Sequence, residues 1–185
     1  MIKAHKGNVF DYLEKENIDT LFNAANGIGP MGCGIAGAIR KHGGMEIQEE
    51  AIRVCATNNP LPGEAYVTGS GKLSKYGVSK IIHAVTMRNP GGITSYGVVE
   101  KAFKSALVLS KNLKSHIICC TALGTGVGGL SPIIVAKIMY NTALYFSVGL
   151  DIIFIDLDEQ FINSLGTFIE KDMWDEKYES VPLKD

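Results

Sequence analysis

Two kinds of hydrophobic pattern alternate along the chain. Short runs rich in β-branched residues predict strands, and between them lie longer segments whose apolar residues recur every three or four positions, as on one face of a helix. This alternation is typical of an α/β fold in three layers, with helices on both sides of a mixed sheet of about six strands. The predicted strands span residues 2–7, 18–24, 64–70, 80–86, 116–122 and 150–156. The predicted helices span residues 10–16, 34–44, 45–55, 94–113, 131–147 and 158–172.

A serine and a proline mark the start of one predicted helix. The Ser131 hydroxyl can cap free N–H groups, and Pro132 in the first turn loses no hydrogen bond, because the N–H that it lacks has no partner there. We therefore expect the glycine-rich segment before them to end at residue 130.

The length and composition of the chain indicate one domain. Its 185 residues can bury one sizeable core, and we expect residues 1–170 to form it and the charged segment 171–185 to be loosely held. An apolar share of 46% and a net charge of −1 leave no broad basic surface. We therefore expect no sequence-specific binding of nucleic acid.

Targeting signals and metal-ligand patterns are both missing from the sequence. The first residues, MIKAHKGNVF, lack the apolar core of a signal peptide, and no run reaches the roughly 18 apolar residues of a membrane span. We expect a cytoplasmic protein with no membrane contact. The cysteines form no CxxC pair and have no histidine at ligand spacing, which predicts reduced, mostly buried thiols and no bound metal or cofactor. They are Cys33, Cys55, Cys119 and Cys120.

Two segments match the pattern GxGxxG, each after a predicted strand and before a predicted helix. They are GCGIAG at residues 32–37 and GTGVGG at residues 124–129. The bare N–H groups of such a loop can approach phosphate oxygens, and the dipole of the following helix adds to the attraction. One match is weak evidence. Two, at the ends of different strands, could hold a diphosphate from both sides.

A dinucleotide-binding Rossmann domain is the remote alternative, which would make the protein an NAD-dependent oxidoreductase. Such a domain has one glycine fingerprint, with an acidic residue about 20 positions later for the ribose. Asp156, at the end of the strand after the second loop, supports this alternative. A helix start at Ser131, beyond the third glycine, and a chain too short for a separate substrate domain oppose it.

Three segments together resemble the macro domain family, whose members are ADP-ribose-binding α/β/α modules. They are LFNAANGIGPMGCGIAGAI, GEAYVTGSGKLSKYGVSKIIHAV and TALGTGVGGLS, and the resemblance runs in order from about Gly7 to Leu157. It implies a cleft at the carboxyl ends of the strands that takes ADP-ribose or an ADP-ribosylated macromolecule. It also implies glycine-loop contacts with the ligand from Gly32, Cys33, Gly34, Ile35, Ala36, Gly124, Thr125, Gly126, Val127 and Gly128.

Asn26 is the asparagine that the resemblance places at the distal ribose. The residues alone allow another interpretation, in which its amide closes its own turn. We favour the ligand contact for Asn26 and a structural role for Asn23.

The adenine end of the implied cleft falls at two places in the sequence. Asn8 and Val9 fall at one of them, in GNV, which resembles the family's GDI. Asn8 stands where the family has an acidic residue that accepts a hydrogen bond from the adenine amino group, and it could instead cap the following helix. Asp156 and Leu157 also fall beside the adenine. They could equally open a capped helix.

The resemblance does not imply one catalytic mechanism, because branches of the family differ in their catalytic residues. One hydrolase branch carries an aspartate at the position of Ala36, and another uses a lysine and an aspartate where Met87 and Gly128 stand here. Viral-type members with alanine at the first position resemble removers of ADP-ribose all the same. The resemblance thus implies Asn26 as the catalytic residue of an enzyme that hydrolyses mono-ADP-ribosyl linkages or dephosphorylates ADP-ribose 1''-phosphate. A non-catalytic reader of ADP-ribose is the alternative.

Four other side chains admit a chemical role. His42 could be a general base, but its place at a predicted helix end favours an exposed position. His83 alternates with apolar neighbours on a strand, which predicts a core histidine. Arg88 could reach a phosphate. Cys33 could be a reactive thiol, although a small side chain in a tight turn is the simpler interpretation.

Overall fold

The sheet of the computed structural model has six strands in the order β1-β6-β5-β2-β4-β3. The structure describes the backbone of residues 1–179 and the side chains of residues 1–172. Neighbouring strands run parallel except β3, which is antiparallel to β4. The prediction of an α/β fold with a mixed sheet is therefore confirmed. The strands are β1 (Ile2–Lys6), β2 (Thr20–Asn26), β3 (Ala65–Gly69), β4 (Lys80–Met87), β5 (Ile117–Cys120) and β6 (Asp151–Asp156).

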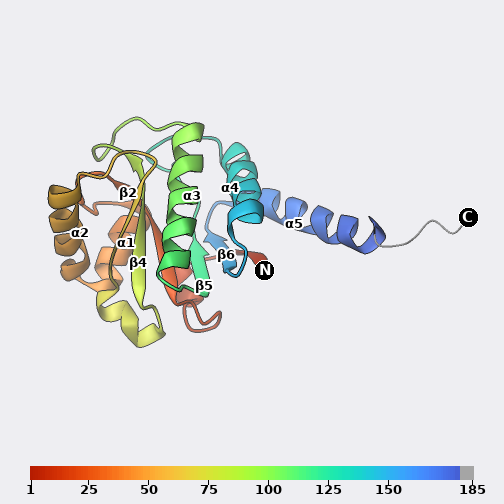
Figure 1. Cartoon of the computed structure of the whole chain (residues 1–185), viewed down its shortest axis with the longest axis horizontal. Coiled ribbons are helices and arrows are strands. Elements are labelled where there is room, and N and C mark those ends of the chain that lie inside the picture. The colour runs from red at the N-terminus through yellow and green to blue at the C-terminus, as the bar shows by residue number, and fades with distance from the viewer. Residues whose placement is uncertain (180–185) are drawn as a thin grey trace, which may run out of the picture.

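Helices cover both faces of the sheet (Figure 1). Successive strand residues point to opposite faces, so Phe22 and Ile82 pack with α3, α4 and α5, whereas Leu21 and Ile81 pack with α1. Because both faces are buried, the central strands are apolar on both sides. The predicted three layers are confirmed. The helices are α1 (Gly34–Gly43), α2 (Met45–Asn58), α3 (Tyr96–Asn112), α4 (Pro132–Phe146) and α5 (Glu159–Glu179).

Residues 10–16 do not form the predicted α-helix. The chain makes a short 3-10 helix, η1 (Val9–Asp11), followed by turns in which the Ile18 N–H donates to the Leu13 carbonyl. Leu13 and Ile18 are both fully buried, and the turns bring both side chains to the core before β2 begins. The apolar residues spaced three to four apart are therefore buried here by turns and not by a helix. A second 3-10 helix, η2 (Gly71–Tyr76), was not predicted and buries Leu73.

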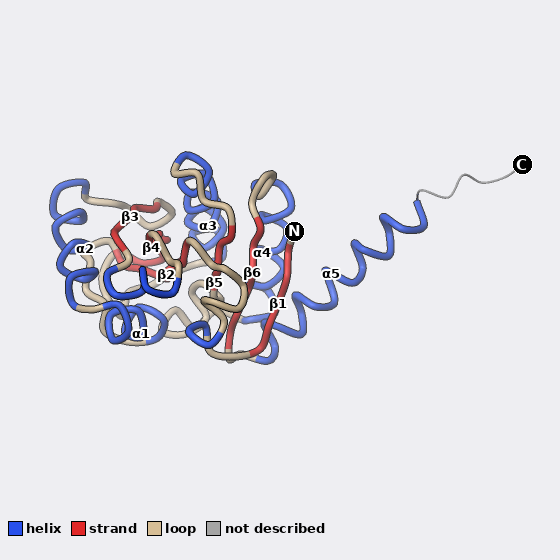
Figure 2. The backbone as a smooth tube through the Cα atoms, turned by 90° about the horizontal axis from the view of Figure 1, so that it is seen from below, coloured by secondary structure: helices blue, strands red, loops and turns tan. Residues whose placement is uncertain are grey.

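Two helix ends differ in detail from the sequence prediction. Helix α4 begins after Ser131 as predicted, but the Ser131 hydroxyl makes no capping bond. The backbone N–H of Ser131 donates to the Tyr96 hydroxyl at 3.3 Å. Helix α5 runs on to Glu179 and extends past the β1 edge of the sheet (Figure 2). The boundary proposed near residue 170 falls inside this helix, and the proposed tail 171–185 lies partly outside the described residues.

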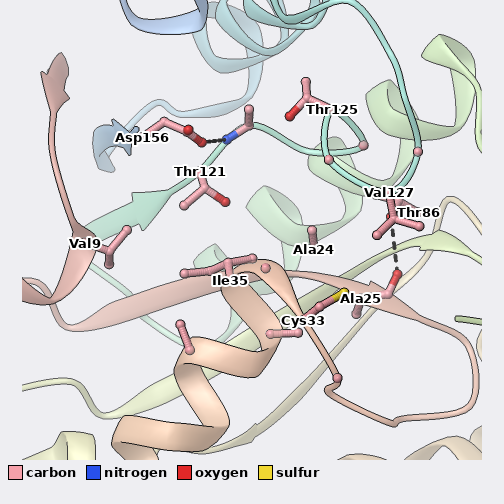
Figure 3. Close-up of a pocket in the computed structure, with 18 of the residues that line it drawn as sticks. Val9, Ala24, Ala25, Cys33, Ile35, Thr86, Thr121, Thr125, Val127 and Asp156 are labelled. Carbon is pink, nitrogen blue, oxygen red and sulfur yellow. Dashed lines mark hydrogen bonds between the residues drawn. The ribbon is translucent and has the colours of Figure 1, made fainter. Parts of the chain in front are cut away.

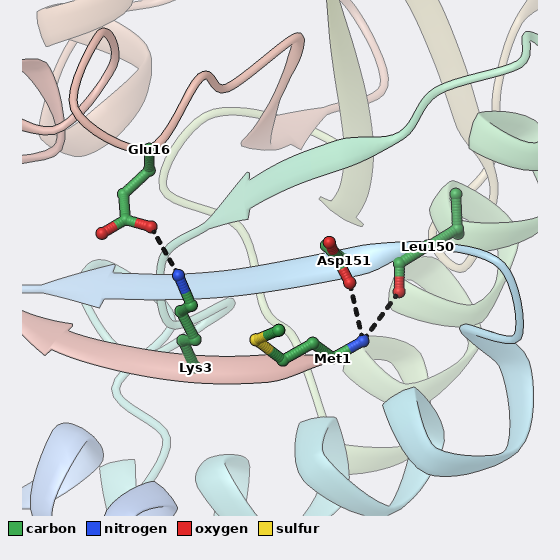
Figure 4. A network of polar contacts seen from close by, with 5 residues as sticks. All are labelled: Met1, Lys3, Glu16, Leu150 and Asp151. Atoms are coloured by element: carbon green, nitrogen blue, oxygen red, sulfur yellow. Dashed lines mark hydrogen bonds and ion pairs between the residues drawn. The ribbon is translucent and has the colours of Figure 1, made fainter.

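Charged contacts surround β1, which pairs with β6 at the edge of the sheet (Figure 4). Lys3 Nζ lies 2.9 Å from Glu16 Oε2, and His5 Nε2 lies 3.3 Å from the other oxygen of Glu16. The hydrogen bond from Lys3 lowers the pKa of Glu16, which burial partly opposes. The Met1 amine lies 2.7 Å from Asp151 Oδ1. Charged groups along an edge strand also discourage pairing with another chain.

None of the helices in the described part of the chain has the length and apolar character needed to cross a membrane.

Candidate functional site

A cavity of about 540 Å³ opens at the carboxyl ends of the parallel strands. Each of these strands contributes a residue at or just beyond its end. Because parallel strands end at the same edge of a sheet, side chains far apart in the sequence meet here, and this is where open α/β sheets bind ligands. One such residue for each of β1, β2, β4, β5 and β6 is Asn8, Asn26, Thr86, Thr121 and Asp156.

The two glycine loops face each other across this cavity (Figure 3). Cys33 and Ile35 lie on the side of the first loop, and Thr125 and Val127 on the side of the second. Every residue for which the family resemblance implies a ligand contact lines the cavity, including Val9, Ala36 and Leu157. The residues named from the sequence therefore lie around one cavity. The hydrogen bonds of the polar side chains among them are described below.

The glycines of the two loops are there for two different reasons. Gly34 and Gly124 have φ angles of 56° and 76°, which side-chain-bearing residues rarely adopt. A Cβ on Gly128 would come within 2.5 Å of the Gly124 carbonyl oxygen. Gly32 and Gly126 differ, because neither has a positive φ and a Cβ on either would meet no protein atom within 4 Å. Nothing in the protein itself requires glycine at these two cavity-lining positions.

Backbone N–H groups line both sides of the cavity. Helix α1 begins at Gly34 with no side-chain cap, and the N–H groups of residues 34–36 donate to no residue that the structure describes. The same holds for the N–H groups of residues 125–128 in the second loop. Unpaired helix N-terminal N–H groups and the helix dipole both attract anions. The arrangement can therefore hold negatively charged groups between the loops.

Asn26 closes its own turn, which is the interpretation that the sequence analysis ranked second. Its Oδ1 accepts hydrogen bonds from the N–H groups of Ile28 (3.1 Å) and Gly29 (2.8 Å). Its Nδ2 donates to the Pro30 carbonyl at 2.8 Å. The amide keeps one N–H for the cavity that it lines. Asn23 has the structural role predicted for it, because its Nδ2 lies 3.0 Å from His83 Nδ1 in the core.

Asn8 and Asp156 also bond within the protein. Asn8 Oδ1 accepts from the Phe10 N–H at 3.1 Å, which is the predicted capping role, here on η1. Asp156 Oδ1 accepts from the Asp158 N–H at 2.8 Å, and Oδ2 accepts from the Ala122 N–H at 2.9 Å. Both carboxylate oxygens thus fix the chain around the ends of β5 and β6. Leu157, by contrast, is 73% exposed at the cavity rim.

The cap of α5 is a residue that the sequence analysis did not single out. Asp158 Oδ1 accepts from the Phe161 N–H at 3.1 Å, so a capped helix does follow this segment, but its cap is Asp158 and not Asp156. An aspartate three positions before the first buried helix residue is the signal that could have found it.

His42 is exposed and His83 is buried, as predicted. His42 is exposed near the end of α1, where it lines the cavity and stacks on Phe10 with ring centroids 4.0 Å apart. His83 is fully buried, its Nε2 lies 2.9 Å from the Thr68 hydroxyl, and its ring stacks on Tyr66. Burial lowers the pKa of His83 to about 3, so this imidazole is neutral at physiological pH.

Arg88 does not reach the cavity. Its guanidinium donates to the Pro60 carbonyl and the Asn59 side chain, which fixes the loop after α2, so the predicted phosphate contact is wrong. The cysteines are free thiols, and all but Cys33 are buried, as predicted. In the described part of the chain, no three His, Cys, Asp or Glu side chains lie close enough together to hold a metal ion.

Several cavity-lining residues were not predicted. They come mainly from the last residues of the strands, and the position of those strand ends is the signal that could have found them. They include Ala24, Ala25, Thr86, Met87, Thr121 and Ala122, together with Pro90 and Gly91 from the loop after β4.

A family model for the macro domain matches residues 22–139, which is more than half of the chain. This chain belongs to the macro domain family. The macro domain is similar to an uncharacterized protein of Aquifex aeolicus, with 34% identity over 166 residues that cover 88% of this chain and 94% of the relative. It is also similar to a macro domain-containing protein of Caldanaerobacter subterraneus, with 33% identity over 131 residues and coverage of 69% and 70%.

Solved structures share the fold of this macro domain. A mutant of the Oceanobacillus iheyensis macrodomain with ADPR superimposes with a TM-score of 0.77 at 21% identity, covering 94% of this chain and 92% of that one. The macrodomain of Mycobacterium tuberculosis DarG gives a TM-score of 0.72 at 21% identity, with coverage of 84% and 97%. The Rossmann alternative fails on topology, because β1 lies at the sheet edge, whereas the first strand of a dinucleotide-binding sheet is central.

Proposed function

We propose that the cavity binds ADP-ribose, with the diphosphate between the two glycine loops. The observation that carries this proposal is the pair Gly32 and Gly126, which line the cavity although neither backbone strain nor a protein neighbour requires glycine there. A side chain at either position would take up space beside the free N–H groups. A diphosphate needs both that space and those donors.

The surroundings of the loops support the same ligand. The titratable side chains that line the cavity are Cys33, His42 and Asp156, and the Asp156 carboxylate is occupied by two backbone N–H groups. The cavity volume of about 540 Å³ is in the range of small-molecule sites. Similar macrodomains from Oceanobacillus iheyensis have been solved with ADPR and with ADP. We assign the adenine to the end near Asn8, Val9 and Leu157 and the distal ribose to the end near Asn26.

Isothermal titration calorimetry with ADP-ribose, ADP and AMP tests this assignment. We expect ADP-ribose to bind more tightly than ADP, and ADP more tightly than AMP, because each step removes a group that the cavity holds. Equal affinities for ADP-ribose and AMP would show that the loops do not hold a diphosphate.

We further propose that the protein hydrolyses an ADP-ribosyl linkage, either on a modified macromolecule or in ADP-ribose 1''-phosphate. The N–H that Asn26 retains is the observation in favour, because it is a donor at the end of the cavity where the distal ribose is assigned. Asn26 would orient the ribose and the attacking water. Ala36, in the first turn of α1, supplies no carboxylate for this purpose.

The alternative is a reader that binds ADP-ribose without turnover, and the lack of a carboxylate at Ala36 favours it. Time-resolved release of ADP-ribose from a mono-ADP-ribosylated protein, with ADP-ribose 1''-phosphate in parallel, separates the two. Turnover in the wild type that is lost in Asn26→Ala identifies an enzyme that depends on Asn26. Tight ADP-ribose binding with no turnover of either substrate identifies a reader.

A further inference from the structure

Three segments of the chain meet at the end of the cavity assigned to the distal ribose. They are residues 26–31 after β2, residues 89–95 after β4 and residues 124–131 after β5. The Gly27 N–H donates to the carbonyls of Met87 and Arg88, which joins the first segment to the start of the second. A Cβ on Gly128 would come within 2.5 Å of Thr94 Cγ2, so the second segment also lies against the third. The three segments therefore form one rim, which we call the distal rim.

Each segment of the distal rim exposes one large apolar side chain. Ile93 is 95% exposed, Val127 is 59% exposed and Ile28 is 39% exposed. Val127 itself lines the cavity, and Ile28 and Ile93 each lie within two residues of positions that line it. Apolar side chains gathered at the mouth of a binding site gain free energy when a partner covers them, and such patches mark interaction surfaces. The distal rim is therefore a candidate surface for a larger partner than the ligand in the cavity.

The three segments of the distal rim contain no charged side chain. They include no Lys, Arg, His, Asp or Glu. The charged residue nearest to them in the sequence is Arg88, whose guanidinium is held by the Pro60 carbonyl and the Asn59 side chain. A nucleic acid would bring its phosphates to this surface, and proteins bind such phosphates mainly with Lys and Arg. An apolar and uncharged surface fits a polypeptide instead, because apolar side chains form the centre of protein interfaces.

We propose that the distal rim, with Ile28, Ile93 and Val127, is the docking surface for a polypeptide that carries ADP-ribose and has apolar residues beside the modified position. The inference rests on the proposed binding of ADP-ribose with its distal ribose near Asn26. ADP-ribose is attached to a macromolecule through the distal ribose, so the residues next to the attachment point lie over this rim. The distal rim thus selects the class of macromolecule, which the cavity alone leaves open.

Calorimetry with three conjugates of ADP-ribose tests the inference. Each conjugate has a linkage that cannot be hydrolysed, so that turnover does not disturb the measurement. The first is a short peptide with leucine and valine beside the modified position, the second is the same peptide with glutamate there, and the third is single-stranded DNA. We expect the wild type to bind the apolar peptide conjugate about 10-fold more tightly than free ADP-ribose, because apolar surface is buried. The other two conjugates should bind no more tightly than free ADP-ribose.

Ile93→Asp separates docking on the distal rim from binding in the cavity. Because Ile93 is almost fully exposed, the fold should be retained. The affinity for the apolar peptide conjugate should fall about 10-fold, to that of free ADP-ribose, while the affinity for free ADP-ribose stays within about twofold of the wild type. Ile93→Leu keeps an apolar side chain and should bind the conjugate as the wild type does.

Val148→Asp is the matched control. Val148 is 77% exposed and lies just before β6, whose other end reaches the cavity at Asp156. The substitution therefore adds the same charge at the opposite edge of the sheet. It should leave the affinities for the apolar peptide conjugate and for free ADP-ribose unchanged.

Several results would overturn the inference while the proposed function stands. They are equal affinities of the wild type for the apolar peptide conjugate and free ADP-ribose, equal affinities for the two peptide conjugates, and unchanged affinity of Ile93→Asp for the apolar one. Tighter binding of the DNA conjugate than of the apolar peptide conjugate would assign the surface to nucleic acid and also overturn it. A wild type that binds neither free ADP-ribose nor any conjugate would overturn the proposed function and this inference with it.

Discussion

The two glycine loops share one sequence pattern and are held in place by different means. The first loop, residues 27–37, is fixed by side chains outside its glycines: Asn26 bonds three of its backbone groups, and Gln48 of α2 accepts from the Met31 N–H at 2.8 Å. The second loop, residues 124–130, closes on its own backbone. The N–H groups of Gly129 and Leu130 donate to the carbonyls of Gly126 and Gly124.

This difference shows that a glycine motif does not by itself reveal what supports it. In the first loop, truncating a polar side chain removes several hydrogen bonds at once. In the second loop, the geometry depends on glycine conformations and close contacts, such as the approach of Gly128 to the Gly124 carbonyl and to Thr94. The first loop should therefore respond most to loss of side chains, and the second to addition of them.

The largest expected effect is that of Gly126→Glu in the second loop. Because a Cβ at this position meets no protein atom, the fold should be retained, while the added bulk and charge oppose a diphosphate. We expect ADP-ribose affinity to fall by about 100-fold or more in calorimetry, which corresponds to about 2.7 kcal/mol. Gly166→Glu, at a position on α5 that is equally open, is the matched control and should bind normally. Unchanged affinity in Gly126→Glu would refute the role of the second loop.

Asn26→Ala should have the next largest effect, on stability. The substitution removes three hydrogen bonds of the first loop and leaves the N–H of Gly29 and the Pro30 carbonyl without their partner. We expect the free energy of unfolding to fall by about 2 kcal/mol in urea titrations. Asn163→Ala, on the exposed side of α5, should change it by less than about 0.5 kcal/mol. Equal stability of the two variants would show that Asn26 does not hold the loop.

Gly34→Ala and Gly32→Ala give the smallest effect and separate the two reasons for glycine within the first loop. Gly34 has a φ of 56°, so alanine there should destabilise the protein by about 1 kcal/mol. Gly32 has neither a positive φ nor a close neighbour, so alanine there should leave the melting temperature unchanged and weaken only ADP-ribose binding. Thermal unfolding and calorimetry of both variants measure this. The same melting temperature for both would contradict the distinction.

The sequence by itself determined the strands, the layers and the two glycine loops that line the cavity. The four inner strands β2, β4, β5 and β6 are readable because they are buried on both faces, which leaves short apolar runs with few alternatives. The cavity is readable because its glycine loops directly follow strands, and parallel strands must end at one edge. The exception, residues 10–16, shows the limit: apolar spacing reports burial, and turns bury Leu13 and Ile18 as well as a helix would.

Only the tertiary structure decided where the polar side chains bond. The sequence placed Asn26, Asn8 and Asp156 beside the ligand, and the structure shows that each first satisfies backbone N–H groups of its own surroundings. The choice depends on which donors the folded loops bring within about 3 Å, a distance that residue order does not encode. For the same reason Thr121 looks in the sequence like any strand-end threonine. Its buried hydroxyl has no hydrogen-bond partner among the residues that the structure describes, which is a property of the packing around it.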